Sequence, residues 1–124
     1  MYRELYLQAE AVRELAYAPY SNFKVGAAVL TKEGVMYTGV NIENSSFPAG
    51  ICAEQVALSK AISQGERNFE AIAICGNDGI AWPCGICRQF LYEFAPEIKV
   101  ITGEDEDHLE IETLTTLLPK GFTL

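Results

Sequence analysis

The 124-residue sequence is poor in basic residues, has a single histidine and lacks any long apolar run. Nine lysine and arginine residues against seventeen acidic ones leave a formal net charge of −8. No basic cluster offsets this charge, so a polyanion would be repelled and we expect no nucleic-acid partner. Residues 1–18 mix charged and apolar side chains, unlike a signal peptide or a membrane span. We therefore expect a cytoplasmic protein without a membrane partner.

The composition otherwise fits one globular domain. Hydrophobic residues make up 49% of the chain and charged residues 21%, which argues against disorder. A chain of this length has room for one core and little more, so residues 1–124 are expected to form a single domain. In a reducing compartment the four cysteines favour metal binding over disulfides.

Hydrophobic periodicity predicts helices alternating with strands. A polar segment with Pro48 and Gly50, residues 41–51, is expected to be a loop. Because the first two strands form a hairpin, the pattern predicts a layered α/β fold with a mixed sheet. The expected helices are residues 1–17, 52–62, 83–94 and 109–118, and the expected strands are residues 23–30, 35–40, 69–75 and 98–101.

Two cysteine motifs, Cys52-Ala53-Glu54 and Pro83-Cys84-Gly85-Ile86-Cys87, predict a catalytic zinc site. Three thiolates fill three corners of a zinc tetrahedron and leave the fourth for water, whereas a structural site closes all four. A carboxylate beside such a site can move protons between water and a leaving amine. Both motifs stand at predicted helix starts, where unpaired N–H groups offset negative charge.

Several of the candidate residues also have a simpler interpretation. Cys75 lies in an apolar run and is expected to be a buried strand residue, although a fourth thiolate would make the zinc purely structural. His108 lies in an acidic run and is expected at the surface. From the residues alone, Asn41 and Glu43 fit a turn-forming pair equally well. Glu54 alone would suit any first helical turn.

Four separated segments make the chain resemble the small zinc-dependent cytidine deaminases of the homotetrameric type. The segments are Tyr20-Ser21-Asn22-Phe23-Lys24-Val25-Gly26-Ala27-Ala28, Thr38-Gly39-Val40-Asn41-Ile42-Glu43-Asn44, Pro83-Cys84-Gly85-Ile86-Cys87-Arg88-Gln89 and Leu117-Leu118-Pro119. The resemblance implies a three-layer α/β/α sandwich holding one Zn²⁺. It also implies hydrolytic deamination of cytidine and 2′-deoxycytidine to the uridine nucleosides, in pyrimidine salvage.

The same resemblance implies roles for individual residues. Cys52, Cys84 and Cys87 would hold the zinc. Phe23 would pack beside the pyrimidine, while Asn41 and Glu43 would hydrogen-bond the ribose hydroxyls.

The backbone N–H of Ala53 would contact the base carbonyl, and Glu54 would hold the ring nitrogen and the zinc-bound water. Phe47 and Phe122 would reach into the sites of neighbouring subunits in a homotetramer.

The chain departs from the family pattern near the metal and near the substrate. Gln55 stands where relatives carry an arginine that donates to the zinc thiolates. We expect Gln55 to donate to a cysteine sulfur, and zinc to be a weaker Lewis acid unless the helix dipoles or Arg88 supply the missing positive charge. Phe47 and Trp82 replace a tyrosine and a small residue, which leaves a modified or analogue nucleoside, such as blasticidin S or an N4-modified cytidine, as an alternative substrate.

Overall fold

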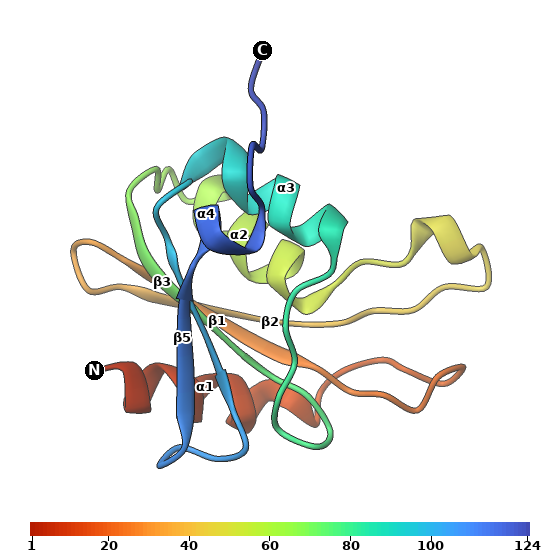
Figure 1. Cartoon of the computed structure of the whole chain (residues 1–124). Coiled ribbons are helices and arrows are strands. Elements are labelled where there is room, and N and C mark those ends of the chain that lie inside the picture. The colour runs from red at the N-terminus through yellow and green to blue at the C-terminus, as the bar shows by residue number, and fades with distance from the viewer.

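The computed structural model describes all residues, Met1–Leu124, as one five-stranded sheet covered by helices on both faces (Figure 1). The strand order is β2-β1-β3-β4-β5, and only the β3–β4 pair is parallel. The predicted three-layer sandwich with a mixed sheet is confirmed. In chain order the elements are α1 (Tyr2–Arg13), β1 (Gly26–Thr31), β2 (Met36–Val40), η1 (Phe47–Ala49), α2 (Ala53–Ser63), β3 (Phe69–Cys75), α3 (Gly85–Phe94), β4 (Lys99–Gly103), β5 (Leu109–Thr113) and α4 (Leu114–Leu117).

The two faces of the sheet carry separate hydrophobic cores, because the side chains of a strand point alternately to its two sides. Helix α1 covers one face, and α2, α3 and α4 cover the other (Figure 1). In β1, Ala28 and Leu30 belong to the α1 core, whereas Ala27 and Val29 belong to the α2 core. This double coverage explains why β1 and β3 are apolar along almost their whole length.

Gly39 lets helix α2 lie close to strand β2. A Cβ atom at this position would be 2.6 Å from the carbonyl oxygen of Ala53 and would also collide with the N–H group of Ala57. Only glycine permits this approach, which fixes the first turn of α2 against the sheet.

The main error of the sequence-based prediction concerns residues 109–118, which were expected to form a helix. Residues 109–113 instead form the edge strand β5, paired antiparallel with β4, and only residues 114–117 are helical. Ile111 and Thr113 are β-branched, and pairing with β4 overrides the weak helical pattern.

Strand β1 also begins later than predicted, at Gly26, because the side chain of Asn41 bonds to the N–H of Val25 and to the carbonyl of Phe23 just before it. Helix α1 ends at Arg13, four residues before the predicted end at Tyr17. No helix of the structure is both long enough and apolar enough to span a bilayer.

Candidate metal centre and substrate cleft

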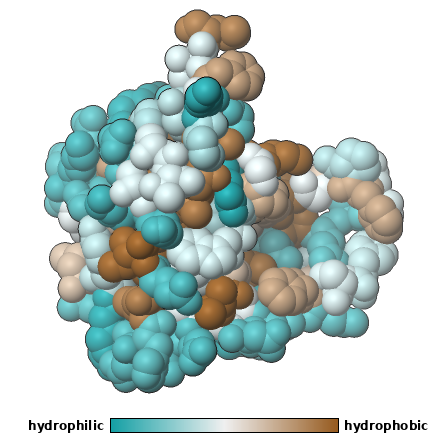
Figure 2. Space-filling view, viewed as in Figure 1, coloured by the Kyte–Doolittle hydropathy of each residue, from teal (hydrophilic) through white to brown (hydrophobic).

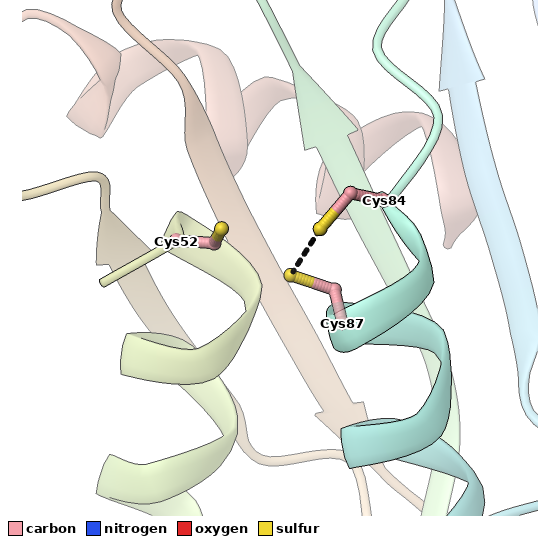
Figure 3. Close-up of side chains that lie close together, drawn as sticks. All are labelled: Cys52, Cys84 and Cys87. Carbon is pink, nitrogen blue, oxygen red and sulfur yellow. Dashed lines mark hydrogen bonds between the residues drawn. The ribbon is translucent and has the colours of Figure 1, made fainter. Parts of the chain in front are cut away.

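Three cysteine thiols meet where helices α2 and α3 begin. Cys52 is the N-cap residue of α2 and Cys84 that of α3, while Cys87 lies in the first turn of α3. Their side chains point toward one another (Figure 3), and the three sulfurs lie within 4.8 Å of one another. The sequence therefore predicted correctly that the two motifs converge at two helix N-termini.

The spacing of the sulfurs fits zinc. The Sγ atoms of Cys84 and Cys87 are 3.8 Å apart, and a regular tetrahedron with Zn–S bonds of about 2.3 Å has an edge of roughly 3.8 Å. No fourth histidine, cysteine or carboxylate joins the group. Cys75 is a buried residue of β3 in the core on the α1 side, and its sulfur accepts a hydrogen bond from Arg13. The alternative of a closed site with four cysteine ligands is therefore wrong.

The three thiols differ in burial and acidity. Cys87 is buried, Cys52 is half-buried and Cys84 is exposed. The adjacent thiol of Cys87 lowers the pKa of Cys52 to about 7, and the same contact together with burial raises the pKa of Cys87. The positive ends of α2 and α3 favour thiolate at the site as a whole.

Glu54 is a buried acid beside these sulfurs. Glu54 is only 6% exposed, and burial raises the pKa of its carboxyl group above the ordinary value. Burial of this kind is how proteins keep a carboxyl group able both to accept and to donate protons.

A cleft of about 410 Å³ opens from the metal corner toward the loops that follow β2. It brings together most residues expected to bind substrate, although they come from distant parts of the chain. The cleft is lined by Val25, Asn41, Ile42, Glu43, Phe47, Gly50, Ile51, Cys52, Ala53, Glu54, Trp82 and Cys84. Phe23 and Phe122 do not line it.

Phe23 lies just outside the cleft and packs on the chain that follows β3. A Cβ atom at Gly76 would be 3.0 Å from the Phe23 ring and 3.1 Å from Ala81. Asn41 fixes this segment, since its Oδ1 accepts from the N–H of Val25 at 2.8 Å and its Nδ2 donates to the carbonyl of Phe23 at 2.9 Å. These two bonds are why residues 23–25 do not extend β1.

Glu43 is held by the segment before Phe23. Its carboxylate accepts hydrogen bonds from the N–H groups of Tyr20 and Ser21 and from the hydroxyl of Ser21. The Ser21 hydroxyl is the main reason that the pKa of Glu43 lies below its ordinary value. The Ser21 oxygen in turn accepts from the N–H of Phe23 at 3.0 Å.

Sequence reasoning missed Ser21, although a serine beside asparagine two residues before Phe23 is a common turn signal. It also missed Thr102, whose hydroxyl accepts from the N–H of Ala81 and donates to the carbonyl of Ile74, both at 2.8 Å. Thr102 thereby fixes the loop that leads to Trp82.

Gln55 and Arg88 make contacts other than those expected. The Oε1 of Gln55 accepts from the N–H of Cys52 at 3.2 Å, so Gln55 caps α2, and its donation to a sulfur stays a prediction. Arg88 donates from Nε to the carbonyl of Pro83 and from Nη1 to the carbonyl of Leu117, each at 2.7 Å.

The aromatic residues expected to act between subunits are both exposed. Phe47, 76% exposed, packs edge-on against Tyr20. Phe122, 64% exposed, lies on the C-terminal end, which projects from the molecule and carries hydrophobic side chains (Figure 2). His108 is exposed and bonded to Asp105, as expected for a surface residue.

Comparison with known proteins agrees with this geometry. The sequence profile for the cytidine and deoxycytidylate deaminase zinc-binding region matches residues 1–103. A cytidine deaminase of Sporosarcina psychrophila is 41% identical over 97% of this chain and 90% of its own length. A probable cytidine deaminase of Dictyostelium discoideum is 47% identical over 93% of this chain and 79% of its own length.

The structural match is as extensive. The crystal structure of a cytidine deaminase from Burkholderia pseudomallei superposes with a TM-score of 0.91 at 42% identity, covering 98% of this chain and 99% of the other. A cytidine deaminase from Mycobacterium tuberculosis gives a TM-score of 0.89 at 34% identity over 99% of this chain and 98% of the other. Matches of this length, together with three thiols placed for zinc, show that the chain belongs to the zinc-binding cytidine and deoxycytidylate deaminase family.

Proposed function

We propose that this protein, acting as a single catalytic domain of residues 1–124, deaminates cytidine and 2′-deoxycytidine to uridine and 2′-deoxyuridine with release of ammonia. The observation that carries the proposal is the buried carboxyl group of Glu54 beside three converging thiols in one cleft. Cys52, Cys84 and Cys87 are the proposed zinc ligands. When bound, zinc supplies a Lewis acid that makes water nucleophilic near neutral pH.

Glu54 is the proposed proton carrier. The base must be protonated at the ring nitrogen next to C4, water must add to C4, and ammonia must leave as a neutral molecule. Glu54 would accept one proton from the attacking water and deliver it to the ring nitrogen. It would then accept the remaining proton of the hydroxyl added at C4 and deliver it to the departing amine, so that ammonia leaves and the C4 carbonyl forms. Its raised pKa suits both directions of transfer.

The walls of the cleft are suited to holding a nucleoside. The N–H of Ala53 stands at the first residue of α2, where a helix leaves its backbone donors unpaired, and can donate to the base carbonyl. Asn41 and Glu43 offer an amide and a carboxylate to the ribose hydroxyls. Phe23 is the proposed aromatic neighbour of the pyrimidine.

An ultraviolet assay of the purified protein tests the proposal directly. Cytidine, 2′-deoxycytidine, cytosine and blasticidin S are supplied separately, and the loss of absorbance of the cytosine ring and the release of ammonia are measured. We expect turnover of the first two. Turnover of none, with zinc bound, would contradict the proposed function.

A second candidate keeps the reaction and changes the substrate. Trp82 lines the cleft together with Phe47 and Cys84, so a bulky indole forms part of the cleft wall. Preference for blasticidin S or an N4-modified cytidine over cytidine in the same assay would favour this candidate.

We also propose that the protein works as a homotetramer with shared sites, in cytoplasmic pyrimidine salvage. The exposure of Phe47 and Phe122 supports this, since large aromatic side chains in water favour burial by another chain. Light scattering would measure the mass. Co-expressed Glu54→Gln and Phe122→Ala chains should then regain activity together, because mixed assemblies contain sites with an intact Glu54 and a neighbour's Phe122.

A further inference from the structure

Arg88 links the zinc-binding turn of α3 to the end of α4. Its Nε donates to the carbonyl of Pro83, the residue before Cys84, and its Nη1 donates to the carbonyl of Leu117, each at 2.7 Å. Its backbone N–H also donates to the carbonyl of Cys84 at 3.0 Å. This backbone bond is the first helical bond of α3 and does not depend on the arginine side chain. The side chain itself holds the chain just before Cys84, through the carbonyl of Pro83.

Cys84 needs such support more than the other two proposed ligands. It is the one exposed cysteine of the three, and the next residues, Gly85 and Ile86, are exposed as well. Cys52 and Cys87 are held by a helix cap and by burial, respectively. The turn is buried at both ends, at Pro83 and at Cys87, but packing leaves Cys84 itself free, so a polar link at Pro83 can set where the Cys84 sulfur points.

The other end of the link is firmly anchored. Helix α4 begins at Leu114, a fully buried residue of the core between the sheet and helices α2 and α3. Leu117 ends this helix, where carbonyl groups lack helical partners and favour an arginine donor. The C-terminal segment is tied to α3 again farther on, because Gln89 donates to the carbonyl of Phe122 at 2.9 Å.

We propose that Arg88 is a positioning residue of the zinc centre, which holds Cys84 in ligating geometry by clamping the Pro83 carbonyl to the end of α4. The planar guanidinium presents its donors in a fixed fork, so it can hold two carbonyls at a set separation. Its role is geometric: the Nε and Nη1 donors of Arg88 are directed at carbonyls, and no sulfur is among its hydrogen-bond partners. This inference rests on the proposed zinc ligands.

Zinc release separates the geometric role from an electrostatic one. Zinc-loaded wild-type protein, Arg88→Lys and Arg88→Ala are each mixed with an excess of the chromogenic chelator 4-(2-pyridylazo)resorcinol. Lysine keeps the positive charge but cannot hold both carbonyls, so we expect both variants to release zinc at least about tenfold faster than the wild type. Release from Arg88→Lys at the wild-type rate would overturn the proposal.

Arg67→Lys is the matched control. Arg67 also donates to two carbonyls, those of Ile62 and Glu66. It follows the C-terminal end of α2, whereas Cys52 caps the N-terminal end of that helix. The Arg67→Lys protein should release zinc at the wild-type rate.

Thermal unfolding with and without zinc gives a second test that does not depend on turnover. Zinc raises the melting temperature by an amount that reflects its affinity for the folded state. We expect a smaller rise in Arg88→Lys than in the wild type, and an equal rise would assign Arg88 a purely structural role. Neither test requires a substrate, so both can be interpreted even if the protein does not deaminate cytidine.

Discussion

The metal corner and the substrate loops of the same cleft are built by different means. The corner stands on two helix starts packed into the core, where Ala53, Glu54 and Cys87 are all buried. The loops are exposed and are held by side-chain hydrogen bonds, chiefly those of Asn41 and Glu43. Most of the corner is thus placed by packing, with the exposed Cys84 and its proposed Arg88 clamp as the exception, whereas the loops are placed by polar networks. Changes in the corner should therefore abolish function, whereas changes in the loops should tune it.

Removing a metal ligand should have the largest effect. Cys84→Ala leaves two sulfurs at the corner, so we expect the zinc content to fall well below one per chain and activity to be lost. Cys75→Ala is the matched control, because this buried cysteine lies in the core on the other face of the sheet and should keep its zinc. Metal analysis of both purified proteins checks the prediction, and a full zinc complement in Cys84→Ala would remove Cys84 from the ligand set.

Removing the proposed proton carrier should abolish turnover and spare the metal. Glu54→Gln keeps the size and burial of the side chain but cannot exchange protons, so we expect turnover to fall about a thousandfold. Zinc content and melting temperature should stay near those of the wild type. A variant that keeps more than about a hundredth of the parent rate would rule out the assigned role.

The corner was predictable from the sequence because local rules determine it. Residue types and spacing predict that each cysteine motif starts a helix, and the preference of zinc for several thiolates predicts that the two motifs meet, although the contact between Cys52 and Cys84 is made only by the fold. The edge strand β5 was missed although residues 109–113 alternate apolar and polar side chains, which is a strand signal. This run is short and leads directly into Leu114, Leu117 and Leu118, whose spacing is helical, and its backbone partners lie in β4.

The loop networks were not predictable for a related reason. Ser21 contacts Glu43 across 22 positions, and Arg88 contacts Leu117 across 29. Nothing local marks either pair, since such contacts exist only once the fold has brought the segments together. The family resemblance named Asn41 and Glu43 as substrate residues, whereas their second role in holding residues 20–25 came from the structure.

The loop side of the comparison is tested by Asn41→Ala. The change removes two bonds to the Phe23 segment and the proposed ribose contact. The ribose contact alone, at about 1 kcal/mol, lowers kcat/KM for cytidine about fivefold, and the misplaced Phe23 segment should add to this loss while zinc stays bound. Asn44→Ala is the control, since Asn44 bonds only within its own loop, to the N–H of Ser46. An equal loss in both variants would show that general loosening of the loop, and not Asn41 itself, controls substrate binding.

The smallest expected effect concerns the dependence of folding stability on pH. In the wild type the Ser21 hydroxyl is the main cause that lowers the pKa of Glu43 below 4.5, so the folded state favours the ionised carboxylate. The stability gained in this way is present above about pH 4.5 and is lost as the pH falls through the lowered pKa.

Ser21→Ala should remove most of that gain, with little effect on the metal corner. The urea concentration at the unfolding midpoint should be measured between about pH 7 and pH 3. It should be higher for the wild type at neutral pH, and the midpoints of the two proteins should approach each other in acid. Ser45→Ala is the control, because the Ser45 hydroxyl bonds to the hydroxyl of Tyr20 and touches no carboxylate. A wild-type advantage that stayed constant down to pH 3 would show that Ser21 stabilises the loop without acting through the charge of Glu43.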